Sequence, residues 1–172
     1  MTRSHQKERI PCRGAAVTVL FLMLSPAGAA AGDMPDAVRT PGWVNPDVTQ
    51  DNIGATVCNA GWTKTIRPRT KYTTDLKIRQ INEYGYNDKN PKNYEEDHLI
   101  SLQLGGHPTD PRNLWPQPYD SACGARIKDV LETKLKRIVC AGSLTLAEAQ
   151  RLIASDWISA YQKFVKPAGC GG

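Results

Sequence analysis

Apolar residues recur with a helical period in the C-terminal third of the chain. From residue 125 to residue 139 they return every three or four positions, which places five of them on one side: Ile127, Val130, Leu131, Leu135 and Ile138. Four charged residues fall off that stripe, namely Lys128, Asp129, Glu132 and Lys136. The pattern predicts an amphipathic helix that ends before Gly142.

Two further helices are predicted. Thr145 and Glu148 have the spacing of a capping box, and they open a segment that runs to about Lys166. We expect its buried face to contain Leu146, Ala149, Ile153, Trp157, Ala160, Tyr161 and Phe164. A weaker pattern predicts a helix over residues 72–84, with Thr73 or Thr74 as its N-cap and Gly85 closing it.

Shorter apolar runs indicate strands. Residues 61–68 alternate apolar and polar side chains up to Pro68, which is typical of a short strand. Residues 98–104 predict a second strand, and Leu114-Trp115 lies on or just past its return strand, which Pro116 and Pro118 stop early. The helix at 125–139 follows, so the order is strand, strand, helix. We expect one α+β domain, mostly helical, over residues 47–166.

The two ends of the chain have a different character. Residues 1–31 combine a basic start, an apolar segment at 15–24 and small residues at 29–31, which is typical of a secretory signal peptide; an uncleaved anchor is the alternative. We expect a flexible lead-in over residues 32–46 and a C-terminal tail over residues 167–172. The protein is thus predicted to be exported, periplasmic or secreted, and free of the membrane after cleavage of the signal.

The charge of the chain changes once the signal is set aside. The 172 residues contain 22 Lys and Arg and 17 Asp and Glu, a formal net charge of +5. Four of those basic groups and one of the acidic groups lie in residues 1–31, so the remainder carries +2. Any phosphate-binding face must therefore come from local clustering. The densest basic cluster, which a solvated surface would explain equally well, is Lys64, Arg67, Arg69, Lys71, Lys77 and Arg79.

Four cysteines follow the predicted signal peptide. An even number in an exported chain favours two disulfide bonds, for which three pairings are possible. We favour Cys123–Cys140, which would bracket the helix at 125–139, and Cys58–Cys170, which would tie the ends of the domain together.

Candidate chemistry gathers around residues 94–113. An acidic run ends in Asp97-His98, and Asn113 lies in the apolar run that follows the Gly-Gly turn. Carboxylate oxygens suit a divalent cation, and a neutral imidazole beside them can take a proton from water. We therefore expect Asp97 to bind metal, His98 to act as the general base and the Asn113 amide to fix the loop that aims His98. The alternative is an acidic run on a solvated loop.

Further ligands are expected from the helix that follows. Asp129 and Glu132 share a face, so one of them could complete the cation site, or both could be surface residues. Lys128 either contacts phosphate or pairs with Glu132 four positions on. Glu95 and Glu96 are interpreted as solvated-loop residues.

These residues also carry a family resemblance. Glu-Asp-His-Leu-Ile-Ser-Leu-x-Leu-Gly-Gly at 96–106, with Asn-Leu-Trp-Pro at 113–116, resembles the HNH endonuclease signature of the ββα-metal superfamily over about residues 94–135. The resemblance implies a ββα-metal core in which Asp97 is a metal ligand, His98 the general base and Asn113 the orienting residue. The helix position that is usually His or Asn in that family has no counterpart in Ala-Cys-Gly-Ala at 122–125, so either Asp129 or Glu132 would substitute or the site is incomplete.

A broader resemblance covers about residues 46–165. Gly-Trp-Thr at 61–63, Tyr-Thr-x-x-Leu-Lys at 72–77, Gly-Ala-Arg-x-Lys-Asp at 124–129 and Val-Cys-Ala-Gly at 139–142 are similar to a group of small exported bacterial proteins, mostly without assigned function. This similarity supports export and suggests no activity by itself.

The preferred hypothesis is an exported, metal-dependent HNH-like endonuclease that hydrolyses phosphodiester bonds of DNA, or of RNA, with little sequence specificity. It would use one divalent metal ion, Mg²⁺ before Mn²⁺ or Zn²⁺. The expected contacts to nucleic acid are Lys64, Arg67, Arg69, Lys71 and Lys128. A non-catalytic exported binding protein on a degenerate HNH scaffold is the alternative, and a structural envelope protein is a third possibility.

Overall fold

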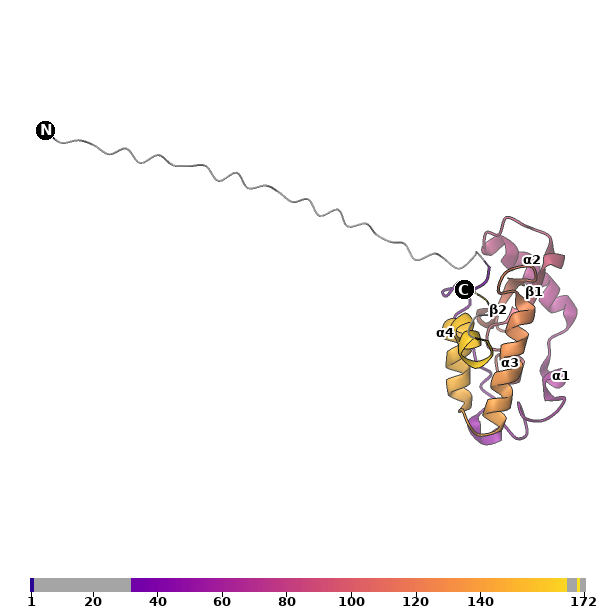
Figure 1. Cartoon of the computed structure of the whole chain (residues 1–172). Coiled ribbons are helices and arrows are strands. Elements are labelled where there is room, and N and C mark those ends of the chain that lie inside the picture. Colours follow the sequence, from indigo (N-terminus) through magenta and orange to yellow (C-terminus); the bar gives the residue numbers. More distant parts are fainter. Residues whose placement is uncertain (2–31, 167–169, 171–172) are drawn as a thin grey trace.

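The computed structural model describes residues 1, 32–166 and 170, which form one folded unit apart from Met1 (Figure 1). Its α-helices and strands are α1 (Trp62–Ile66), α2 (Thr70–Glu83), β1 (Tyr94–His98), β2 (Leu114–Pro118), α3 (Ala125–Cys140) and α4 (Leu146–Phe164). Single 3-10 turns lie at Gln50–Asn52, Pro91–Asn93, Leu102–Leu104 and Pro111–Asn113. The expectation of an α+β chain with more helix than strand is confirmed.

The sheet has two antiparallel strands among the described residues. Tyr94 lies opposite Pro118, and His98 lies opposite Leu114. The prediction that prolines stop the return strand early is wrong, because both Pro116 and Pro118 belong to β2. A strand with one neighbour has a free edge, and a missing N–H on that edge removes no ladder hydrogen bond.

The strand predicted over residues 98–104 is misplaced, because β1 runs from Tyr94 to His98 and therefore ends at His98. Beyond His98 the chain turns, and the 3-10 turn at Leu102–Leu104 closes at Gly105, which has a φ of 72°. Leu99 and Ile100 are both buried. Adjacent residues on a strand point to opposite faces, whereas a turn can direct both into one core.

The predicted strand at 61–68 is also wrong, because this segment contains the short helix α1. Trp62 and Ile66 are four positions apart, a spacing that shares a face in a helix as well as in a strand. Arg67 then takes an extended conformation with φ −61° and ψ 128°, as expected for a residue before proline.

The three longer helices are confirmed within a few residues. Hydrogen bonds between Thr145 and Glu148 form the predicted capping box of α4, with Thr145 N donating to Glu148 Oε2 at 3.0 Å. Gly85, with φ 69°, follows the end of α2 as predicted. The N-cap of α2 is Arg69, however, and not Thr73 or Thr74.

Helices α3 and α4 pack together and form the main core with the turn after β1 (Figure 1). Trp157, predicted to be buried, is at its centre, as are Leu131 and Leu135. The predicted stripe on α3 is wrong at three positions. Lys128 and Glu132 are buried, whereas half of the Val130 surface is exposed.

Residues 32–46 pack on the domain, although their composition had suggested a flexible lead-in. Trp157 Nε1 donates to the backbone oxygen of Asp33 at 2.9 Å, and Val44 forms a β-bridge with Gly106. These contacts join the segment to α4 and to the turn beyond the candidate site. The predicted signal peptide lies outside the described residues except for Met1, and so does the predicted tail except for Cys170.

The disulfide bonds are Cys58–Cys140 and Cys123–Cys170, so the presence of two bonds is confirmed and the favoured pairing is wrong. Cys123 lies just before α3 and Cys140 ends it. A helix of 16 residues is about 24 Å long, far beyond the roughly 4.4–6.8 Å between Cα atoms that a disulfide spans. The two ends of α3 are therefore tied to different parts of the chain.

No helix in the described part of the chain has the length and apolar character needed to cross a membrane.

Candidate functional site

His98 ends β1 and exposes only 6% of its surface. Its Nε2 lies 2.9 Å from the carbonyl oxygen of Pro108. A carbonyl can only accept, so Nε2 carries the proton of the neutral ring and Nδ1 is left as the acceptor. Burial lowers the pKa of His98 below its ordinary value. The ring is therefore neutral near pH 7 and able to take up a proton at Nδ1.

Asn113 is fully buried, and its amide uses its complete hydrogen-bonding capacity. Its Oδ1 accepts from the backbone N–H of Ile100 at 2.9 Å and of Trp43 at 3.3 Å. Its Nδ2 donates to the backbone oxygens of Ile100 at 2.9 Å and of His107 at 3.1 Å. The expected bridging role of this amide is thus present, and it holds the turn after β1 against the loop 107–110 that contacts His98.

Lys128 lies among the residues expected to bind metal, and it has no exposed surface. Its Nζ is 2.6 Å from Glu132 Oε1 and 2.7 Å from Asp97 Oδ2, and it donates to the backbone oxygen of His98 at 2.8 Å. Burial acts to lower the pKa of Lys128, but the two carboxylates outweigh that effect and raise it. The ammonium therefore stays charged. Of its two predicted roles, pairing with Glu132 is the one present, and a buried Nζ does not reach a phosphate.

A cavity of about 80 Å³ lies beside this ion-pair cluster. Its lining includes His98, Arg67 and five carboxylates: Glu95, Glu96, Asp97, Asp129 and Glu132. Burial, followed by repulsion from Asp97, raises the pKa of Glu95 to about 7 and also raises the pKa of Asp129. A cation in this acidic cavity would lower the pKa of both carboxyl groups.

The three predicted metal ligands, Asp97, Asp129 and Glu132, all line that cavity, so the fold brings them together. They do not enclose an ion by themselves: among the described residues, no three His, Cys, Asp or Glu side chains are placed to hold a metal. Magnesium typically keeps several waters and uses one or two carboxylates plus substrate phosphate, whereas structural zinc takes an enclosed set of nitrogen and sulfur ligands. Lys128 already contacts both Asp97 and Glu132, so a Mg²⁺-type ion beside Asp97 and Asp129 would have to keep most of its waters.

Glu95 and Glu96 lie on β1 and line the cavity, whereas their sequence context had suggested a solvated loop. Both carboxylate oxygens of Glu96 are buried, with no hydrogen-bond partner among the described residues. Burial raises the pKa of Glu96 to about 9. The strand places Glu95 and Asp97 on one face, a relation that the correct strand boundaries would have revealed in the sequence.

A second and larger cleft, of about 220 Å³, adjoins the acidic cavity. It is lined by Arg67, Pro68, Thr70, Thr73, Thr74, Lys77, Glu95, Glu96, His98 and Tyr119. Four of these residues also line the acidic cavity, namely Arg67, Glu95, Glu96 and His98. His98 therefore stands between an acidic cavity and a cleft rich in hydroxyl groups.

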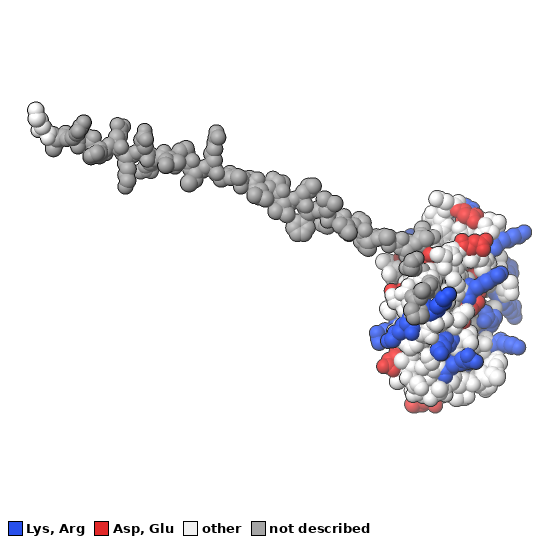
Figure 2. Space-filling view, viewed as in Figure 1, with Lys and Arg blue, Asp and Glu red and all other residues white. Residues whose placement is uncertain are grey.

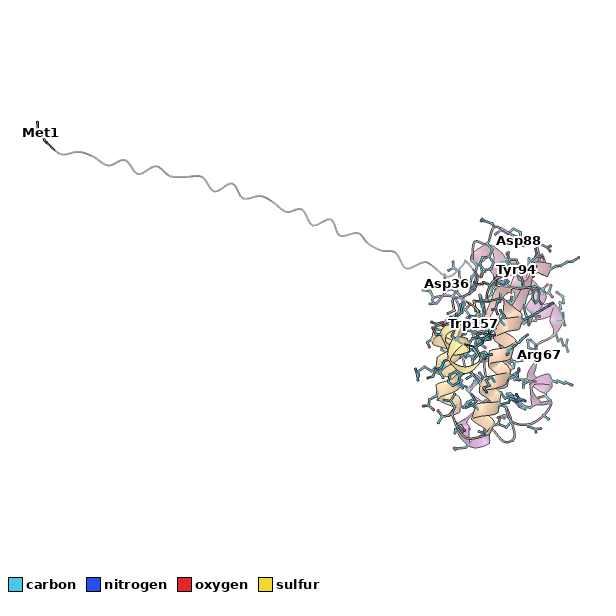
Figure 3. All side chains as sticks on the ribbon, viewed as in Figure 1. Met1, Asp36, Arg67, Asp88, Tyr94 and Trp157 are labelled. Atoms are coloured by element: carbon cyan, nitrogen blue, oxygen red, sulfur yellow. A yellow bond between two sulfur atoms is a disulfide. The ribbon has the colours of Figure 1, made fainter. Side chains whose placement is uncertain are left out.

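Of the five predicted nucleic-acid contacts, Arg67 alone lines the larger cleft. It lies on the side of the domain that carries α1 and α2 (Figure 3). Lys64 and Arg69 are exposed outside the cleft lining, and the exposed Lys71 pairs with Asp75 at 2.6 Å. Figure 2 shows lysine and arginine side chains spread over the visible face and not gathered in one patch.

Sequence reasoning placed Lys77 in the basic cluster but missed the three threonines that α2 contributes to the cleft: Thr70, Thr73 and Thr74. Their signal was the threonine-rich start of the helix, a pattern that also suits N-caps. Threonine is equally suited to line a polar cleft, and only the position of α2 against β1 distinguishes the two uses.

Comparison of the chain with protein-family models, with curated proteins and with solved structures found no match.

Proposed function

We propose that this protein is an exported, metal-dependent, HNH-like endonuclease that hydrolyses phosphodiester bonds of DNA or RNA. The observation that carries the proposal is the setting of His98: a buried neutral imidazole whose Nε2 is occupied by Pro108 and which lines both the acidic cavity and the larger cleft. The order β1, β2, α3 is the one expected of a ββα core. Two disulfide bonds support export.

In the proposed reaction, Nδ1 of His98 accepts a proton from the water that attacks phosphorus. Asn113 keeps the ring aimed, because its four hydrogen bonds hold the loop that fixes Nε2. Arg67 is positioned to offset negative charge on the phosphate. A bound Mg²⁺-type ion, held by Asp97 and Asp129, would supply stabilisation of the leaving oxygen. A positioned general base contributes about 10²–10⁴-fold to the rate.

The test is cleavage of plasmid DNA and of single-stranded RNA by the purified, oxidised protein, with Mg²⁺, Mn²⁺ or EDTA. His98→Ala should reduce cleavage by at least about 100-fold. His107→Asn is the matched control, because Asn can replace the His107 Nδ1 that accepts from Thr109 N and Asp110 N. Full activity of folded His98→Ala would refute the assignment of the base.

Lys128 favours a second candidate, a non-catalytic exported binding protein on a degenerate HNH scaffold. Its ammonium already neutralises Asp97 and Glu132, the task that a metal ion would otherwise perform. This candidate predicts binding of nucleic acid without cleavage under every metal condition. It also predicts no rise in thermal stability on addition of Mg²⁺ or Mn²⁺, because no metal ion binds to the folded state.

A further inference from the structure

The first residues after the predicted signal peptide are buried. Gly32 and Asp33 both lie inside the fold, and the backbone oxygen of Asp33 accepts the hydrogen bond from Trp157 Nε1. A Cβ atom on Gly32 would lie 2.7 Å from Cγ of Pro118 and 3.7 Å from Cζ of Tyr86. Gly32 therefore packs closely against the end of β2 and against the segment that follows α2.

Two polar atoms near Gly32 are buried without a hydrogen-bond partner. They are Oδ1 of Asp33 and Oη of Tyr86. This hydroxyl is carried by Cζ, the Tyr86 atom that approaches Gly32. Burial raises the pKa of Tyr86, and the charge of Asp33 adds to the rise, so the carboxylate lies close enough to the phenol to act on it. A buried oxygen without a partner destabilises a fold, so a donor that reached both atoms would stabilise this one.

The predicted processing of the chain would create such a donor. In the uncleaved chain the nitrogen of Gly32 belongs to a peptide bond and can donate one hydrogen bond. Hydrolysis of the Ala31–Gly32 bond adds one water, leaves a carboxylate on Ala31 and turns this nitrogen into an α-ammonium, with three N–H donors and a positive charge. Asp33 Oδ1 and Tyr86 Oη can both accept from it, and its charge complements the Asp33 carboxylate.

A cleft lined by three tyrosines adjoins this position. Its volume is about 270 Å³, and Pro118, the residue against which Gly32 packs, is part of its lining. The stacked rings of Tyr86 and Tyr94, with centroids 5.3 Å apart, line it as well. The face of an aromatic ring attracts a cation. The surroundings of Gly32 therefore suit a positive charge in addition to providing two unpaired acceptors.

We infer that the α-ammonium of Gly32 is a structural cation of the processed protein, paired with Asp33 Oδ1 and Tyr86 Oη. The inference rests on the export that the proposed function includes, and it is independent of the proposed hydrolysis. The folded state gains this contact only after cleavage, so the processed chain is more stable than a chain that keeps residues before Gly32.

The first measurement is the intact mass of the full-length chain after export from a bacterial host, for which we expect a protein that begins at Gly32. Two proteins are then compared by thermal unfolding: one begins at Gly32, and the other keeps Ala31 as its first residue. The extra residue moves the ammonium by about 3.8 Å. The Tm should fall by about 3–6 °C, because loss of a hydrogen bond to a charged group lowers the ratio of folded to unfolded protein about tenfold.

Asp33→Asn is the sharper variant, because it keeps the shape of the side chain and removes its charge. In this background the extra Ala31 should lower the Tm by less than half as much, since the charged partner is already absent. Tyr86→Phe should reduce the effect as well, because it removes the second acceptor. Asp47→Asn, which removes an exposed carboxylate from the same N-terminal segment, is the control, and there the extra residue should have its full effect.

The outcomes are distinct. Equal Tm values for the two starting points, or the same loss in Asp33→Asn as in the wild type, would overturn the pairing even if the protein cleaves DNA. An exported chain whose mass shows another first residue would also overturn it. The expected pattern of Tm values in a protein that cleaves no nucleic acid would support the inference and refute only the proposed hydrolysis.

Discussion

The ammonium nitrogen of Lys128 lies 2.7 Å from Oδ2 of Asp97, in a position without solvent exposure. The same nitrogen is 2.6 Å from Glu132 and bonds the backbone of His98. One buried cation thus links the end of β1 to α3, and it joins the candidate base to the candidate metal ligands. This cluster makes Lys128 a positioning residue of the site.

Lys128→Met should destabilise the protein by about 3–5 kcal/mol, because it leaves two buried carboxylates without their cation. Urea unfolding followed by circular dichroism in EDTA measures the change. Adding Glu132→Leu to this variant should recover part of the loss, since one of the uncompensated charges is then removed. A stability within about 0.5 kcal/mol of the wild type would show that the ion-pair cluster does not hold the fold.

The pH dependence of cleavage should reflect His98. A general base must be neutral, and burial places the pKa of His98 below its ordinary value of 6.5. The rate should therefore stay high down to about pH 6.5 and fall only below it. The measurement is kcat/KM against pH with a short oligonucleotide. An acid limb well above that value would assign the limb to another group.

Glu96→Gln should stabilise the protein at alkaline pH. The pKa of Glu96 is about 9 in the folded state against 4.5 for the free group, so the folded state binds the proton more tightly. The free energy of unfolding should then fall as pH rises between those values. In Glu96→Gln this fall should be reduced, and Glu83→Gln on the exposed surface of α2 is the control. Identical pH profiles for all three proteins would contradict the burial of Glu96.

Gly106→Ala should disrupt the turn that holds the site. A Cβ atom there would lie 1.6 Å from the backbone oxygen of Ile100 and 2.8 Å from Asn113 Nδ2, so the backbone must move. We expect a loss of at least about 3 kcal/mol in thermal or urea unfolding. Gly54→Ala, where a Cβ meets nothing within 4 Å, should change stability by no more than about 0.5 kcal/mol. Equal effects of the two changes would contradict the packing at Gly106.

Peptide mapping of the oxidised protein should recover Cys58 linked to Cys140 and Cys123 linked to Cys170. The bonds close sequence separations of 82 and 47 residues, for which chain entropy gives about 4 kcal/mol each. Replacing either pair by serine should lower stability by a similar amount. Recovery of a peptide joining Cys123 to Cys140 would contradict the fold around α3.

Part of this site was visible in the sequence. The features that could be predicted depend on residues close together in the chain, and those that could not depend on distant residues. Asp97, His98 and Asn113 stood out because their chemistry is concentrated in a short stretch. Lys128 was predicted to contact phosphate or to pair with Glu132, but its burial was not predicted, because it falls off the apolar stripe of α3. Predicting burial from periodicity requires that charged residues face solvent. This condition fails where a lysine pairs with two carboxylates inside the fold.

The sequence by itself determined the helices α2, α3 and α4, since their periodicity and caps are local. It also determined that two disulfide bonds would form. Tertiary structure decided which cysteines pair, that residues 61–68 form a helical turn, and that Thr70 faces the same cleft as His98. Each of these features depends on which distant segment of the chain packs against the residues concerned. A local pattern that fits either a strand or a helical turn becomes one of them only through that packing.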